Sequence, residues 1–258
     1  MHLAKIPWAI RDLRSGSQFH RTGSPLAFIY SITLFINAAL LFILEPMVAK
    51  MVLPFLGGSP AVWNTSLVFY QACLLAGYAY AHFASAWLGT RRHALLHLSL
   101  LFAGLLLLPI VLPLHWLGAP SGNPVSLVLG VLAVSIGFPF LILSAGAPLL
   151  QKWFAQCQPS AARDPYFLYA ASNAGSLAGL LAYPFLLEPR LPLSEQNRVW
   201  FIGYLVLLAL VALCVLYFLR PLTGHLDEKS PPIEYQKPRA FHADALTLAR
   251  RLRWILWG

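Results

Sequence analysis

Long apolar stretches separated by short polar connections dominate the pattern of this chain. Each stretch reaches the roughly 20 residues that a helix needs to cross the hydrocarbon core of a bilayer. The predicted membrane spans cover residues 25–54, 61–88, 92–116, 124–153, 165–187 and 198–219. The pattern therefore predicts an all-α protein, a polytopic membrane bundle of six transmembrane helices.

The segments outside this bundle are polar and basic. Residues 1–24 are predicted to form a basic N-terminal tail, residues 25–220 the six-helix domain, and residues 221–258 a linker followed by a basic amphipathic segment. In that segment, Arg250, Arg251 and Arg253 alternate with apolar residues, a pattern suited to an anionic membrane surface. A new apolar run begins near Trp257, so we expect a truncation before a further helix; the alternative is a natural tail that anchors at the membrane interface.

The lysines and arginines predict how the bundle is oriented. Fifteen of the 18 lie in the two tails and in the connections after the second and fourth spans, which all fall on one side of the membrane. Positively charged loops remain in the cytoplasm, and an even number of spans places both termini there. We therefore expect a multi-pass protein of a bacterial inner membrane with both termini cytoplasmic.

Composition excludes several other classes of protein. The chain is 59% hydrophobic and 10% charged, whereas soluble domains average roughly a quarter charged residues. The net charge of +9 is scattered over helix ends, so no continuous basic face is predicted for nucleic acid. Cys73, Cys157 and Cys214 lie far apart in the sequence and indicate neither a disulfide framework nor a zinc site. No cofactor is expected.

Glu45 is the strongest candidate for a functional residue. An ionisable side chain inside a membrane span is costly and usually faces the interior of the bundle. Pro46 follows it and frees the carbonyl of Phe42, so the place is suited to a cation or a proton. In the alternative interpretation, Lys50 neutralises a structural carboxylate near the outer interface. Glu188, also followed by proline, repeats the Glu-Pro pair but is a weak match.

A polar stripe runs along the second predicted span. Asn64, Gln71 and Tyr78 recur at steps of seven residues and therefore share one helical face. Such a stripe suits a helix that lines a cavity, and it equally suits hydrogen bonds between helices. Both interpretations remain open for these three candidate residues.

Small residues recur every four positions in the fifth predicted span. Ala171, Gly175 and Gly179 are spaced so that two helix backbones could approach closely. We expect this face to serve packing, with neighbouring Asn173 as the one candidate for contact with a ligand.

His93 and His97 are four residues apart, a spacing that metal sites on helices use. The sequence offers no third ligand, so no metal is predicted, and the alternative is a pair of histidines near the cytoplasmic headgroups.

Two longer stretches resemble a known family. The first reads LEPMVAK from residue 44 and LPFLGGSPAVWNT from residue 53. The second reads APLLQKWF from residue 147 and DPYFLYAASNAGS from residue 164, followed by Tyr183-Pro184. Together they resemble the N-terminal membrane region of the bacterial fused major-facilitator/spermidine-synthase-like proteins, over about residues 25–220 and the basic approach at 250–257.

The resemblance implies half of a major facilitator transporter, with more helices and a synthase-like domain following it. No GxGxxG motif follows a predicted strand in this chain, so it is not expected to be an enzyme by itself. Its expected partners are the lipid bilayer, a small cationic solute such as a polyamine, and a C-terminal half, a synthase-like domain or a second copy.

Two functions follow from these observations. In the first, the bundle is transporter-like, with the six candidate residues Glu45, Lys50, Asn64, Gln71, Tyr78 and Asn173 lining a cavity for the cation. In the second, the bundle is a membrane anchor for a synthase-like domain and transports nothing.

Overall fold

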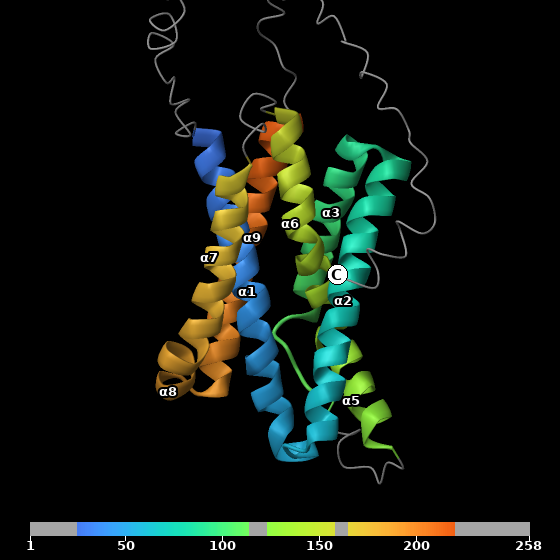
Figure 1. Ribbon diagram of the computed structural model, residues 1–258, viewed down its shortest axis with the longest axis vertical. Helices are drawn as coiled ribbons and strands as arrows, with labels where there is room; N and C mark the ends of the chain where they lie inside the picture. Colours follow the sequence, from blue (N-terminus) through green and yellow to red (C-terminus); the bar gives the residue numbers. More distant parts are fainter. Residues whose placement is uncertain (1–24, 114–122, 158–164, 220–258) are drawn as a thin grey trace, which may run out of the picture. The chain divides into compact units, whose positions relative to one another are not determined.

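The computed structural model describes residues 25–113, 123–157 and 165–219, and these residues form helices without any strand (Figure 1). The helices are α1 (Pro25–Leu56), α2 (Pro60–Leu88), α3 (Thr90–Gly104), α5 (Pro124–Leu132), α6 (Phe138–Cys157), α7 (Tyr166–Ala182), α8 (Glu188–Arg190) and α9 (Leu193–Leu219). A 3₁₀ turn follows α3 at Leu105–Leu107, and π-helical turns lie at Ala133–Gly137 and Tyr183–Leu187. The predicted tails lie outside the described residues.

Five of the described helical stretches are long and apolar enough to cross a membrane. They are Pro25–Leu56, Pro60–Leu88, Val125–Cys157, Tyr166–Arg190 and Leu193–Leu219. They coincide with five of the six predicted spans to within a few residues. The all-α prediction is therefore confirmed for the described residues, which have the form of a multi-pass membrane protein.

The prediction for the third span, residues 92–116, is wrong in its length. Helix α3 ends at Gly104, and after the 3₁₀ turn residues 108–113 are not helical. Pro109 favours the ending, because proline removes a helical hydrogen-bond donor and disfavours a helical conformation at the residue before it. Leu108 indeed has φ −108° and ψ 149°. The apolar pattern of the sequence continues past this point, but the helix does not.

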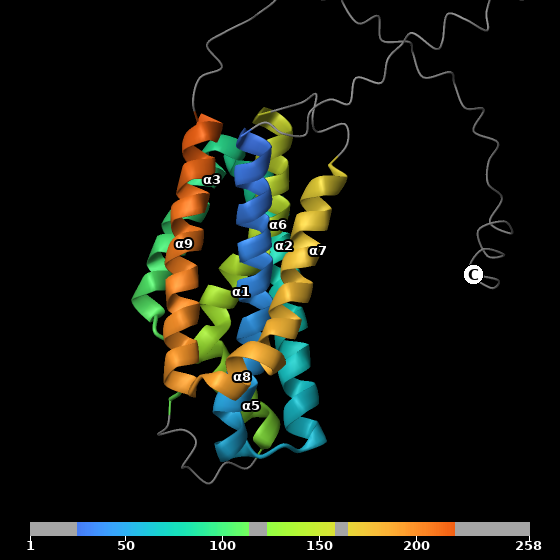
Figure 2. The ribbon, with the colours of Figure 1, turned by 90° about the vertical axis from the view of Figure 1, so that its left-hand side faces the viewer.

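Helix α1 is the central element of the bundle (Figures 1 and 2). It packs against α7, α9 and α6, while α2 covers α6 and α5, and α3 lies against α9 and α6. Twelve residues of α1 are buried, and they lie on one side of the helix. A helix that is apolar on all sides must lie inside the protein or against lipid, and α1 combines both.

The connection between α1 and α2 is determined by its turn residues. Gly57 adopts a φ of +70°, and its N–H bonds to the carbonyl of Leu53 at 2.9 Å, which ends α1. The Ser59 hydroxyl oxygen then accepts a hydrogen bond from the N–H of Val62 at 3.4 Å and caps α2. Pro60 fits the first turn of a helix, where no backbone donor is required. These residues therefore end α1 and start α2 within a short turn.

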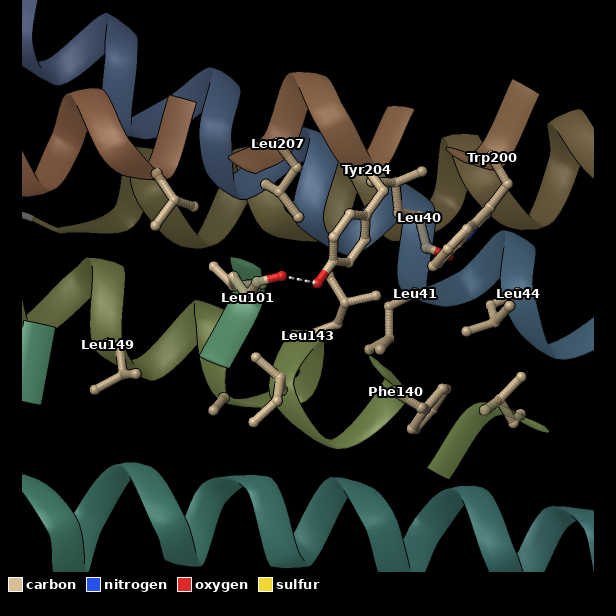
Figure 3. Close-up of a cluster of buried hydrophobic side chains, with 14 of the residues drawn as sticks. Leu40, Leu41, Leu44, Leu101, Phe140, Leu143, Leu149, Trp200, Tyr204 and Leu207 are labelled. Carbon is tan, nitrogen blue, oxygen red and sulfur yellow. Dashed lines mark hydrogen bonds between the residues drawn. The ribbon is translucent and has the colours of Figure 1, made fainter. Parts of the chain in front are cut away.

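Helix α9 is tied to its neighbours by two aromatic side chains (Figure 3). The Trp200 indole N–H donates to the carbonyl of Leu40 in α1 at 2.9 Å, and the Tyr204 hydroxyl donates to the carbonyl of Leu101 in α3 at 2.7 Å. Both rings are completely or almost completely buried among leucines. Large aromatic residues with a polar tip suit this position, because the ring fills the core while the tip is hydrogen-bonded.

The close packing of α7 on α1 confirms the prediction made from its small residues. A Cβ atom at Gly175 would collide with the carbonyl of Phe35, and one at Gly179 would lie 2.7 Å from the carbonyl oxygen of Ala39. These contacts are with backbone, so a side chain could not be accommodated by a change of rotamer. The two glycines allow the helices to approach until their backbones touch.

One side chain of α9 supports the non-helical segment after α3. Asn197 accepts a hydrogen bond from the N–H of Ile110 at 3.2 Å and donates to its carbonyl at 2.8 Å. Ile110 is 2% exposed, and buried irregular backbone requires such partners because no water reaches its polar groups. Asn197 thereby replaces the helical hydrogen bonds that Pro109 interrupts.

Replacing Asn197 with leucine is expected to lower the free energy of unfolding by about 1–3 kcal/mol, the cost of leaving buried polar groups unpaired. Thermal unfolding of the purified chain in detergent measures the change. Asn64→Leu is the matched control, since Asn64 is exposed and is expected to tolerate the change. Equal stability of the two variants would contradict the supporting role of Asn197.

Candidate functional site

A pocket of about 660 Å³ lies beside the C-terminal half of α1. Its walls are formed by α1, the first turns of α2, the end of α5 and the π turn that follows α7. The volume lies in the range of small-molecule sites, roughly 300–1,000 Å³. Most of the lining is apolar, so the few polar groups in it determine which ligand it can hold.

Three charged side chains line this pocket. Lys50 Nζ lies 3.0 Å from Glu188 Oε1 and forms an ion pair between α1 and α8. Glu45 is the third charged residue, one and a half turns before Lys50. Within the described part of the chain, the Glu45 carboxylate has neither an ion-pair partner nor a side-chain hydrogen bond. The lining thus carries two carboxylates against one ammonium group.

Aromatic residues form much of the remaining wall. Tyr70 is buried and its hydroxyl donates to the backbone carbonyl of Glu45 at 3.3 Å. Tyr183 also lines the pocket, and its buried hydroxyl has no hydrogen-bond partner within the described residues. Trp63 is more than half exposed. A pocket lined by a carboxylate and aromatic rings is typical of sites for organic cations, because the ring faces also attract positive charge.

The π turn after α7 brings Tyr183 and Glu188 to the pocket. Pro184 cannot donate to the helical ladder, and the N–H of Glu188 bonds to the carbonyl of Tyr183, five residues before it. Such wider turns redirect the residues that follow and are frequent at functional sites. Leu132, the last residue before the π turn at Ala133–Gly137, also lines the pocket.

The structure separates the six candidate residues into two groups. Glu45 and Lys50 line the pocket together. Asn64, Gln71 and Tyr78 are exposed on α2, on the side that faces away from the described helices, and Asn173 is exposed on α7. No described residue forms a hydrogen bond with the side chains of these four. They neither line this pocket nor join the described helices to one another.

The charged and aromatic lining residues that were not predicted as site residues are Trp63, Tyr70, Tyr183 and Glu188. For Glu188 the sequence does contain a signal, because the Glu45-Pro46 and Glu188-Pro189 pairs proved to lie at the same pocket. For the aromatic residues it contains none, since they resemble the many other aromatic residues of the membrane spans.

His93 and His97, which the sequence suggested lie near the cytoplasmic headgroups, are buried among aromatic side chains. They are 0% and 1% exposed, and their rings pack against Tyr80, with centroid distances of 5.0 and 6.1 Å. Trp153 lies beside His97 at 6.0 Å. No third histidine, cysteine or carboxylate joins them within the described residues, so a metal site is not assembled there.

The chain was compared with known protein families, curated proteins and solved structures. No protein-family model, curated protein or solved structure matches the chain.

A methyl group at Gly175 is expected to force α7 away from α1 and to open the wall that carries Tyr183 and Glu188. Overpacking of this kind typically costs about 1–3 kcal/mol, so Gly175→Ala should lower the thermal unfolding temperature. Ala174→Leu adds a larger group at the exposed neighbouring position and serves as the control. If both variants unfold at the wild-type temperature, the close contact of α1 and α7 is not required.

Proposed function

We propose that this chain is the membrane domain of a transporter-like protein that binds a small organic cation, such as a polyamine, at Glu45. The observation that carries the proposal is the unpaired carboxylate of Glu45 in a pocket of about 660 Å³. A carboxylate within a membrane span requires a partner, and the described residues supply none. A cationic ligand would supply it.

The charges of the pocket support a cation over an anion. The described lining carries Glu45 and Glu188 against a single ammonium group, that of Lys50, so an anion would meet an excess of negative charge. An organic cation would also gain from the rings of Trp63, Tyr70 and Tyr183, which can contribute about 0.5–2 kcal/mol for each close contact. The apolar remainder of the wall suits the carbon chain of an amine.

The exposed polar stripe of α2 fits the same proposal. Asn64, Gln71 and Tyr78 lie where no described helix covers them, and amides in a membrane favour contact with another polar surface. The resemblance to half of a major facilitator transporter suggests that a second half covers them, either a C-terminal region or a second copy. We place the protein in a bacterial inner membrane with cytoplasmic termini, so the pocket at the end of α1 lies in its outer half.

Calorimetric titration of the purified chain in detergent, with putrescine or spermidine, tests the proposal. We expect saturable binding by the wild type and a loss of about tenfold or more in affinity in Glu45→Gln, since hydrogen bonds and ion pairs to a charged group contribute about 1.5–3 kcal/mol. Gln71→Ala is the control, because Gln71 is polar and membrane-embedded but lies outside the pocket.

Two results would contradict the proposal. One is the absence of binding by a sample that elutes as a single species and unfolds cooperatively. The other is binding that Glu45→Gln leaves unchanged. Either result would favour the alternative function, a membrane anchor for a synthase-like domain, in which Glu45 serves only the structure of the bundle.

A further inference from the structure

We infer that Glu188 is a second carboxylate of the cation site and that Lys50 occupies it in the absence of ligand. A ligand with two ammonium groups would pair one with Glu45 and the other with Glu188, displacing Lys50. This inference rests on the proposed function and deepens it, because it assigns the site to dications and gives Lys50 the role of an internal competitor.

The geometry of the ion pair supports this exchange. Lys50 Nζ lies 3.0 Å from Glu188 Oε1, and both side chains line the pocket that contains Glu45. The lysine and glutamate side chains are 36% and 45% exposed, so the surrounding residues do not enclose the pair. A partly exposed pair contributes only about 0–1 kcal/mol, and a competing ammonium group can therefore replace it.

The Lys50 ammonium and a ligand ammonium are chemically alike, so exchanging one for the other at Glu188 changes the free energy little. The lysine head group is a compact ammonium with three donors on a flexible stem, and a primary alkylammonium ligand presents the same charge and the same donors. When one replaces the other, Glu188 keeps a cationic partner throughout. The displaced Lys50 head can move toward the polar interface, as long cationic side chains near helix ends do.

Two carboxylates that line one pocket suit a linear diamine. Glu45 and Lys50 are five residues apart on α1, about 7.5 Å along the helix axis, and Glu188 lies at the head of Lys50. The wall between them is apolar and aromatic and suits a short methylene chain.

Removing the competitor tests the inference. Lys50→Met keeps the length and apolar stem of the side chain but frees Glu188. We expect the affinity for putrescine to rise about two- to fivefold, which corresponds to the free energy of a partly exposed ion pair. The gain should disappear in the double variant Lys50→Met/Glu188→Gln. Affinity for n-butylamine, a monoamine with the same carbon chain, should be the same in the single and double variants.

A second variant keeps the inference testable if Lys50→Met fails to fold. Glu188→Gln should bring the affinity for putrescine close to that for n-butylamine, since only Glu45 then remains to pair with an ammonium group. Unchanged or weaker putrescine binding in a folded Lys50→Met variant would overturn the inference, as would an unchanged preference for the diamine in Glu188→Gln.

These outcomes are separable from failure of the proposed function. If Glu45→Gln abolishes binding while Lys50→Met has no effect, the pocket binds cations at Glu45 alone. If Glu45→Gln has no effect on binding, the proposed site itself is wrong.

Discussion

The backbone contact between α1 and α7 is the constraint on which the site depends. It exists because Gly175 and Gly179 present no side chains to the carbonyl groups of Phe35 and Ala39. One further turn along the same face of α7 lies Tyr183, at the edge of the pocket, and the π turn then leads to Glu188. Small residues thus determine how closely the second wall of the pocket approaches α1, and with it whether Glu188 can reach Lys50.

The polar side chains of the described bundle fall into two kinds, those of the core and those of the pocket. Most polar side chains in its core bind backbone carbonyls, as Trp200, Tyr204 and Asn37 do, and these bonds join α1 to α9, α9 to α3, and α1 to α6. The pocket differs because its charged groups are partly exposed and include one carboxylate without a described partner. In a membrane, such an arrangement costs free energy unless something else binds there, and this cost is the physical basis of the proposed function.

The sequence predicted the helices well because the apolar stretches are long and their turns carry clear signals, as at Gly57 and Ser59. It failed after Gly104, where the hydropathy pattern continues but the helix ends before Pro109. The stripe of Asn64, Gln71 and Tyr78 was assigned correctly to one face of a helix. The sequence could not show that this face lies outside the described bundle, since periodicity gives relative and not absolute orientation. The repeated Glu-Pro pair hinted at Glu188, but its place beside Lys50 depends on the long-range packing of α7 on α1, which no local pattern contains.

The most direct test of the structural account is a zero-length cross-link between Lys50 and Glu188. A carbodiimide joins an ammonium and a carboxylate only where the two groups are in contact, and mass spectrometry of the digested protein identifies the joined peptides. Because Lys50 Nζ lies 3.0 Å from Glu188 Oε1, the account predicts that this pair is linked in the wild type and that the link is lost in Gly175→Ala. Linkage of Lys50 to another carboxylate, or an unchanged link in the glycine variant, would contradict it.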